Sequence, residues 1–330
     1  MKPNIAFVTG GYSGEAEISY LSAKTINANI DRERYTPYTI DIRTDGWWYT
    51  DPSGKAQEVD KNDFSILVDG RKIRFEAVLI GIHGTPGEDG KLQGYFDMLG
   101  LPYTSCDAAT SAITFNKRFT VAVAGMGGIH VAKSVLLVKD LFENPETIVQ
   151  ELRFPVFVKP NNGGSSIGIS KVLEPSEELG AAVEKAFKED NQVLVEEFIQ
   201  GRELTVGVFR GRGEIITLPI TEIKSQNEFF DFEAKYLGKS EEVTPAEIPD
   251  ALAEKVRQTA KRVYSLLNCR GIVRIDFIYN ESVGQPFLLE VNTVPGQSEA
   301  SIVPQQVRAM NLTLVDFYSM LIDEALQSRR

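Results

Sequence analysis

Paired polar side chains on two apolar segments near the C-terminus have the types and spacing of a metal site. Arg274 and Asp276 are two residues apart and therefore share one face of a strand. Glu290 and Asn292 stand in the same relation on the next apolar segment. A hairpin turning around Val283 would place Asp276 opposite Glu290, and the arginine opposite the asparagine. Facing carboxylates repel each other. The pattern therefore predicts either a hard cation such as Mg²⁺, held by carboxylate and amide oxygens, or a solvated sheet face with a salt bridge to Arg274.

A loop rich in glycine and serine is a candidate phosphate site. Residues 161–168 read Asn-Asn-Gly-Gly-Ser-Ser-Ile-Gly and follow Lys159 at the end of a predicted strand. The glycines allow the backbone to approach a phosphate closely, and Ser165 and Ser166 add hydroxyl donors. The segment has neither the Gly-Lys-Ser/Thr ending of a P-loop nor a GxGxxG turn. It is either a hairpin connection or a phosphate-binding loop, and Lys159 together with Lys117 favours the second interpretation.

Carboxylates at the end of the strand predicted at 193–197 suit a nucleoside pocket. Glu196 and Glu197 precede Phe198-Ile199, and Glu203 follows a Gly-Arg turn. Such residues supply a carboxylate for ribose hydroxyls and a backbone segment for adenine. The alternative is a solvated charged face.

Three other segments have two interpretations each. Glu15 lies where the first helix is predicted to begin, and it either meets a ligand or interacts with the helix dipole. His83 opens a loop at a strand end, where α/β sheets bind ligands, although a lone loop histidine is also commonly incidental. The polar and aromatic segment 229–236 is either a water-excluding lid or an amphipathic turn.

The elements that would position these residues fall into three predicted domains, of mixed α/β and α+β class. Residues 1–105 read as an open α/β domain with parallel strands at 5–8, 35–42 and 77–81, and helices after the glycines 10–14 and at 92–99. Residues 106–194 read as a small α+β unit with one helix at 107–125, a helix beginning at Pro145, a helix at 175–188, and strands at 134–138, 156–159 and 193–197. Residues 195–330 carry strands at 203–209, 215–220, 272–279 and 287–291, and helices at 250–267 and 313–326.

Composition restricts the class of protein. A chain of 330 residues exceeds one compact core, which favours two or three domains. The formal charge of −11 argues against nucleic acid as a partner. Cys106 and Cys269 are too few and too far apart for a disulfide framework or a zinc site. No apolar run approaches the ~20 residues of a membrane span. We therefore expect a cytoplasmic protein with no membrane or nucleic-acid partner.

Two longer motifs resemble the signatures of the D-alanine–D-alanine ligase family, within the ATP-grasp superfamily. The first is His83–Gly94, and the second joins Gly271–Phe277 to Leu289–Gly296. The resemblance implies an ATP-grasp fold and the ATP-dependent ligation of two D-alanines to D-alanyl-D-alanine for peptidoglycan synthesis. It also implies D-alanyl phosphate and a tetrahedral intermediate, two Mg²⁺ ions with Mn²⁺ as an alternative, and a homodimer.

The resemblance further implies residue roles. ATP phosphates would be held by Lys117, Lys159, Lys235 and the closing loop with Ser165 and Ser166. The nucleoside pocket would consist of Glu196, Glu197, Ile199 and Glu203. The metal ligands would be Asp276, Glu290 and Asn292. The ammonium of the first D-alanine would meet Glu15, in a hydrogen-bonded chain with Ser165 and Tyr236. The oxyanion would be stabilised by Arg274 and the N–H of Gly296. The remaining substrate contacts would be His83, Ser301 and Ile302.

Other activities remain open at this point. One is a related ligase with D-lactate as acceptor or with L-amino acids as substrates. Tyr236 matches the peptide-forming type, whereas chirality rests on the resemblance alone. Another is a nucleotide-binding scaffold without catalysis, against which the complete set of charged residues argues.

Overall fold

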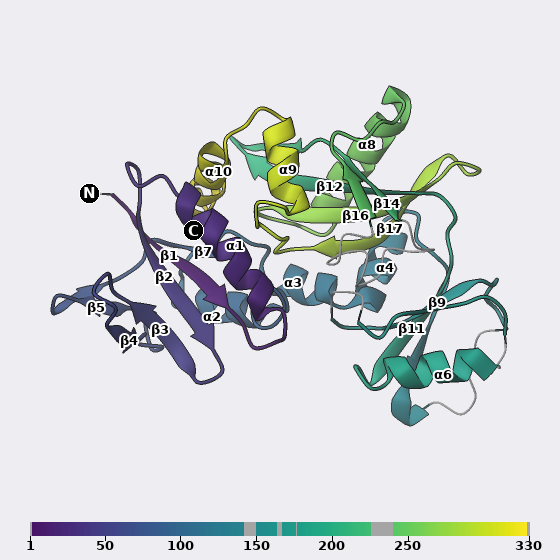
Figure 1. Cartoon of the computed structure of the whole chain (residues 1–330), viewed down its shortest axis with the longest axis horizontal. Helices are drawn as coiled ribbons and strands as arrows, with labels where there is room; N and C mark the ends of the chain where they lie inside the picture. The colour runs from purple at the N-terminus through teal and green to yellow at the C-terminus, as the bar shows by residue number, and fades with distance from the viewer. Residues whose placement is uncertain (1, 142–149, 164–166, 176, 226–239, 329–330) are drawn as a thin grey trace.

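Three large β-sheets and the helices beside them make up the structure (Figure 1). The computed structural model describes residues 2–141, 150–163, 167–175, 177–225 and 240–328. The mixed α/β class predicted from the sequence is confirmed. No helix in these ranges is long and apolar enough to cross a membrane.

The first sheet has the strand order β4-β3-β2-β1-β7. Its strands are β1 (Asn4–Gly10), β2 (Thr36–Arg43), β3 (Gly46–Thr50), β4 (Ala56–Glu58) and β7 (Ala77–Ile80). The fully buried run of β1 pairs in parallel with β2 and β7, as a central strand of a parallel sheet requires. The parallel arrangement was predicted, whereas β3 and β4 extend the sheet in antiparallel fashion. A separate hairpin consists of β5 (Ile66–Val68) and β6 (Arg71–Ile73).

The helices of this region are α1 (Ala16–Asn29) and α2 (Lys91–Leu99). Polar side chains make up most of the buried face of α1, namely Ser19, Ser22 and Thr25 beside Ile26. Their small size lets the helix lie close to its neighbours, and their hydroxyl groups find buried partners that are described below.

The helix predicted at 107–125 is two helices, which corrects the sequence interpretation. They are α3 (Ala108–Phe115) and α4 (Lys117–Met126). Asn116 separates them because its backbone is extended, with φ −96° and ψ 109°, and its side chain accepts a hydrogen bond from Phe119 N–H at 3.0 Å. Asn116 therefore caps α4 and sets Lys117 at the first position of that helix.

The second sheet has the order β10-β9-β11-β8. It consists of β8 (Ser134–Val138), β9 (Val156–Pro160), β10 (Ser170–Val172) and β11 (Gln192–Glu197), with the 3₁₀ turn Lys139–Leu141 after β8. One face packs against α6 (Glu177–Ala186), whose Leu179, Ala182, Val183 and Ala186 are buried. The helix predicted to begin at Pro145 lies outside the described residues.

The third sheet has the order β15-β14-β12-β16-β17, with β13 paired to β12. Its strands are β12 (Arg202–Gly211), β13 (Glu214–Thr217), β14 (Thr221–Ser225), β15 (Ser240–Val243), β16 (Val273–Asn280) and β17 (Gln285–Asn292). The strand predicted at 215–220 ends three residues early because the chain turns into β14. The helices are α8 (Asp250–Leu266), α9 (Ile302–Ala309) and α10 (Leu314–Gln327), of which α9 was not predicted.

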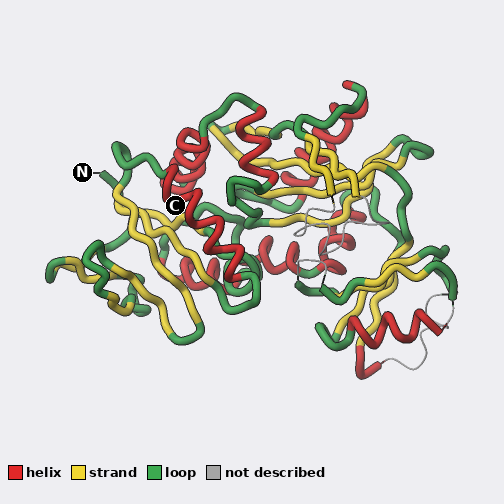
Figure 2. Tube along the Cα trace, in the orientation of Figure 1, coloured by secondary structure: helices red, strands yellow, loops and turns green. Residues whose placement is uncertain are grey.

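The first and third regions share one hydrophobic core. The tube of Figure 2 shows α10 beside the first sheet and α1, against which it packs. One cluster joins Phe7 and Ile26 to Phe317 and Ile322. The first and third of the large sheets lie within the predicted ranges 1–105 and 195–330, whereas β11 of the second sheet continues to Glu197, past the predicted boundary at 194. The division into domains stays a prediction.

Candidate active site

A cavity of about 820 Å³ is lined by residues from all three regions. Every predicted site residue that the structure describes lines it, namely Glu15, His83, Lys117, Lys159, Glu196, Glu197, Ile199, Glu203, Arg274, Asp276, Glu290, Asn292, Gly296, Ser301 and Ile302. The other predicted residues, Ser165, Ser166, Lys235 and Tyr236, lie outside the described residues, as does the predicted lid. Folding therefore brings together side chains that are far apart in sequence.

The hairpin of β16 and β17 has the register predicted from the sequence. Asp276 lies opposite Glu290, and Arg274 lies opposite Asn292. Beyond this pair the register shifts, so Phe277 pairs with Leu288 and not with Leu289. The irregularity leaves Leu289 without a cross-strand partner and lets it line the cavity beside Glu290.

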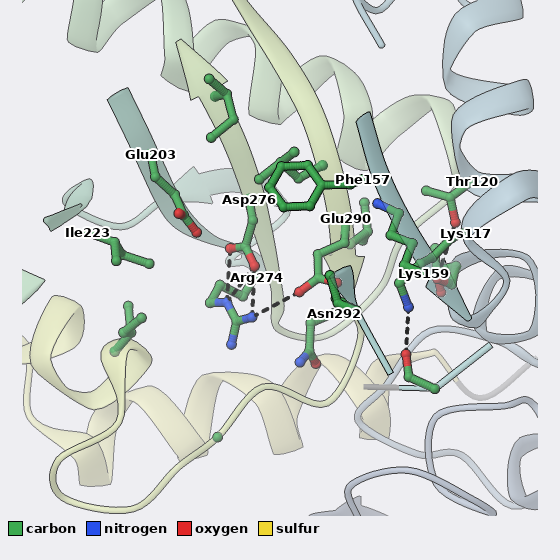
Figure 3. A pocket seen from close by; sticks show the side chains of 18 of the residues that line it. Lys117, Thr120, Phe157, Lys159, Glu203, Ile223, Arg274, Asp276, Glu290 and Asn292 are labelled. Atoms are coloured by element: carbon green, nitrogen blue, oxygen red, sulfur yellow. Dashed lines mark hydrogen bonds and ion pairs between the residues drawn. The ribbon is translucent and has the colours of Figure 1, made fainter. Parts of the chain in front are cut away.

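Arg274 lies between the two carboxylates (Figure 3). Its Nε donates to Asp276 Oδ1 at 2.9 Å and its Nη2 to Oδ2 at 2.8 Å, while Glu290 Oε1 is 3.7 Å from Nη2. Burial alone would lower the pKa of Arg274, but Asp276 and Glu290 raise it overall, so the guanidinium keeps its charge. Arg274 thus supplies part of the positive charge that the facing carboxylates require.

The oxygen atoms of this patch suit a hard divalent cation. Asp276 also accepts a hydrogen bond from Thr205 of β12, and Asn292 Oδ1 accepts one from Val294 N–H at 3.1 Å. Two carboxylates and an amide leave coordination positions for phosphate oxygens and water, as Mg²⁺ prefers. Within the described ranges there is no group of three or more His, Cys, Asp or Glu side chains arranged for a metal. A cation here would therefore depend on Asn292 and on a bound ligand.

Lysines lie on the opposite side of the same cavity (Figure 3). Lys159 of β9 is buried and pairs with Glu196 of β11. Lys117 Nζ donates to Gly163 C=O at 2.6 Å, and the Asn116 side chain donates to Asn162 at 3.1 Å. The start of the predicted phosphate loop is therefore attached to the first turn of α4.

Glu197 is held as a carboxylate at the cavity edge. Arg153 donates its backbone N–H and its guanidinium to Glu197 at 3.0–3.2 Å. Burial would raise the pKa of Glu197, but these hydrogen bonds lower it overall. The interpretation of Glu196 and Glu197 as a solvated face is wrong, because each side chain is buried.

His83 is buried and neutral. Its Nε2 lies 3.0 Å from Ser22 Oγ, and its backbone N–H donates to Ser19 Oγ at 2.9 Å. Burial lowers the pKa of His83 to about 4, and the charge of Arg274 adds to this effect. Its hydrogen bonds join the loop after β7 to α1, so His83 helps to hold the cavity wall in place.

Sequence reasoning missed several lining residues. Glu88 lies within the motif that begins at His83, and its carboxyl faces the cavity. Burial, together with the charge of Glu15, raises the pKa of Glu88 to about 8. Phe157, Ile223 and Thr120 add walls to the cavity (Figure 3). A carboxylate in a glycine-rich loop after a buried strand was the available signal for Glu88.

Comparisons with known proteins give consistent matches along the chain. The model described as "D-ala D-ala ligase N-terminus" matches residues 4–106, and "D-ala D-ala ligase C-terminus" matches residues 118–323. A D-alanine–D-alanine ligase of Flavobacterium johnsoniae is 46% identical over 323 residues, which are 98% of this chain and 99% of the relative. One of Parabacteroides distasonis is 44% identical over 100% of this chain and 99% of its own length.

Solved structures agree with these matches. The VanG D-Ala:D-Ser ligase of Enterococcus faecalis has a TM-score of 0.87 at 32% identity, covering 98% of this chain and 100% of that one. A D-alanine–D-alanine ligase of Bacillus anthracis, complexed with ATP, has a TM-score of 0.78 at 27% identity, covering 99% of this chain and 98% of that one.

Proposed function

The chain belongs to the D-alanine–D-alanine ligase family, and on that premise we propose which side chains carry the reaction. It is an ATP-dependent ligase that joins two D-alanines to D-alanyl-D-alanine for peptidoglycan synthesis. The observation that carries the assignment is one cavity with opposite charges on its two sides. Arg274, Asp276 and Glu290 of the β16–β17 hairpin line one side, and Lys159 of β9 and Lys117 of α4 line the other.

In the first step, a D-alanine carboxylate attacks the terminal phosphorus of ATP and forms D-alanyl phosphate and ADP. Lys117 and Lys159 would compensate the negative charge of the phosphates, and Lys235, Ser165 and Ser166 would join them. Asp276, Glu290 and Asn292 would hold Mg²⁺ or Mn²⁺. A bound divalent ion supplies Lewis-acid stabilisation of the phosphoryl group in transfer.

In the second step, the deprotonated amine of another D-alanine attacks the acyl carbon and phosphate leaves. Arg274 and the Gly296 N–H would stabilise the tetrahedral oxyanion, and a donor of this type is typically worth ~3–4 kcal/mol. Both line the cavity, as does Glu15. Glu15, with Ser165 and Tyr236, would bind the ammonium group of the first D-alanine.

The nucleoside would lie between the second and third sheets. Glu196, Glu197, Ile199 and Glu203 line this part of the cavity, and Phe157 adds an apolar wall. Ser301 and Ile302 would contact the second D-alanine, and His83 would be a further substrate contact; all three residues line the cavity.

A different acceptor is the second candidate, because the VanG structure is named a D-Ala:D-Ser ligase and matches this chain at 32% identity. The test is ADP release by the purified protein with ATP and Mg²⁺. The amino acids to compare are D-alanine, L-alanine, D-alanine with D-serine, and D-alanine with D-lactate, and mass spectrometry identifies the product. D-alanine alone should give the dipeptide. Turnover that requires another acceptor would move the assignment to that acceptor, and ATP binding without turnover would favour a scaffold.

The proposal includes a cytoplasmic homodimer, in keeping with the family resemblance. Sedimentation velocity of the purified protein would measure its assembly, and a monomer at micromolar concentration would contradict the dimer.

A further inference from the structure

Glu88 is a cavity-lining carboxyl group that has no task in the mechanism above. Its Oε2 accepts a hydrogen bond from Gly84 N–H at 2.7 Å, and its own backbone N–H donates to Gly84 C=O at 2.8 Å. The backbone N–H of Val294, in the loop after β17, also interacts with the Glu88 carboxyl. The two loops that hold the family signatures therefore fix this side chain at the cavity wall.

Glu15 borders the same glycine. A Cβ atom on Gly84 would overlap with Oε2 of Glu15 and Oγ of Ser13, so the Glu15 carboxyl lies directly against the Gly84 backbone. Gly84 has φ +67°, a conformation that disfavours any residue with a side chain. Gly84 thus has one carboxyl against its Cα and another on its N–H, and both carboxyls line the cavity.

Two charged groups act on Glu88, and a neutral imidazole lies in its own loop. Glu15 approaches from the start of α1, Arg274 from β16, and the neutral His83 belongs to the same loop as Glu88. Burial, the largest influence, and the charge of Glu15 together raise the pKa of Glu88 to about 8, although Arg274 and the hydrogen bonds from Gly84 and Val294 N–H act to lower it. Without a ligand, Glu88 therefore holds a proton at neutral pH.

We propose that Glu88 is the second carboxyl of the ammonium subsite and that it binds the amino group of the first D-alanine together with Glu15. This inference rests on the proposed function. An ammonium group has three N–H donors and a full positive charge. The carboxyl groups of Glu15 and Glu88, both next to Gly84, offer this ammonium group two acceptors. Such charge-assisted hydrogen bonds are stronger than those between neutral groups.

Binding then releases a proton. The O–H bond of the Glu88 carboxylic acid breaks, the proton passes to solvent, and the carboxylate pairs with the incoming ammonium. Because the unliganded site holds this proton below about pH 8, the affinity for D-alanine should rise as the pH rises from about 6 to 8.

Glu88→Gln tests this role because glutamine resembles the neutral acid. It keeps an oxygen acceptor for Gly84 N–H, so the hydrogen bond within the loop remains, but it cannot acquire a negative charge. We expect the KM of the first D-alanine to rise about tenfold or more with kcat changed less than about threefold, and the pH dependence of that KM to disappear. Glu17→Gln is the matched control, because Glu17 is an exposed glutamate in the first turn of α1, two residues from Glu15. It should leave both parameters unchanged.

Calorimetry gives a readout that does not depend on turnover. D-alanine is titrated into the protein with a non-hydrolysable ATP analogue and Mg²⁺ at about pH 7, in two buffers of different ionisation enthalpy. The wild type should release close to one proton per bound D-alanine, and Glu88→Gln should release none.

Equal KM and equal proton release in wild type and Glu88→Gln would overturn the proposal. Glu88 would then only stabilise its loop through the hydrogen bond with Gly84. If the variant does not fold, the wild-type titration still decides, because binding without proton release contradicts the role. Failure of the proposed function has a different signature, namely no ADP release by the wild type with D-alanine.

Discussion

At the scale of single residues, the facing carboxylates of β16 and β17 give the most direct test of the proposed metal site. Glu290→Gln keeps the size of the side chain and removes one negative charge from the patch of Asp276 and Arg274. If Glu290 is a metal ligand as proposed, activity should fall by about two orders of magnitude or more and the Mg²⁺ concentration at half-maximal rate should rise.

The measurements for this prediction are ADP release against Mg²⁺ concentration and the thermal unfolding temperature. Glu281→Gln is the control, because Glu281 is exposed in the turn of the same hairpin. Full activity of Glu290→Gln would exclude Glu290 as a metal ligand.

His83 gives a second test at this scale. The chain has two histidines, and His130→Gln leaves the imidazole signals of His83 alone in an NMR spectrum. Because burial lowers the pKa of His83 to about 4, its signals should not move between about pH 5.5 and 8. The ordinary pKa of a histidine, 6.5, applies to the unfolded state. Between pH 6.5 and about 4 the folded state therefore binds fewer protons than the unfolded state, and His83 should lower the free energy of unfolding as the pH falls through this range. A midpoint near 6.5 would contradict a buried neutral imidazole.

At the scale of elements, much of the site was predictable because its pattern is local. The two-residue spacing of Arg274 and Asp276, and of Glu290 and Asn292, predicted a shared face on each strand. The pairing of Asp276 with Glu290 followed from one hairpin. The shift after Asp276 was not predictable, since alternation alone does not reveal a bulge. Nor was the break at Asn116, where a polar residue within an alanine-rich run serves as a cap.

A polar chain of contacts that joins four elements also escaped sequence reasoning. Tyr318 OH of α10 donates to Gln297 Oε1 at 3.1 Å, and Gln297 N–H donates to Ser22 Oγ of α1 at 3.0 Å. Ser22 in turn contacts His83 in the loop after β7. All four residues are buried, so the chain fixes the loop that carries Gly296 against α1.

Tyr318→Phe tests the contribution of these hydrogen bonds. It removes the hydroxyl and leaves a buried amide oxygen of Gln297 without that donor, which should cost about 1–3 kcal/mol of unfolding free energy. The KM for D-alanine should rise a few-fold because the Gly296 loop is held less firmly. Urea unfolding and steady-state kinetics measure both. Tyr20→Phe is the control, since it removes an exposed hydrogen bond to Asp41 and should cost less. Equal effects of the two variants would contradict a stabilising role for the buried hydrogen bonds from Tyr318 to His83.

At the scale of the whole molecule, sequence patterns located the sheets but not how they share a core. Phe7 and Phe317 are some three hundred residues apart, yet both belong to one cluster. Amphipathic spacing shows that α10 has an apolar face and does not identify what covers it. The structure places α10 against β7 and α1, so the C-terminal helix stabilises the sheet at the other end of the chain.

Glu324 of α10 makes the packing of this helix against the third region sensitive to pH. Burial raises the pKa of Glu324 to about 7, while the backbone N–H of Gly271 and the guanidinium of Arg210 lower it. The folded state therefore binds more protons than the unfolded state between about pH 4.5 and 7, and stability from this group is lost as the pH rises through that window.

Glu324→Gln should remove this loss, because glutamine keeps an oxygen acceptor and carries no charge. The unfolding free energy should increase by about 1–3 kcal/mol at about pH 8 and change little at about pH 5. Urea unfolding at both pH values measures this, with the exposed Glu214→Gln of β13 as the control. A gain of the same size at both pH values would mean that packing, and not the charge of Glu324, limits the docking of α10. A loss at about pH 8 would show that the ion pair with Arg210, at 4.0 Å, outweighs the burial of the carboxylate.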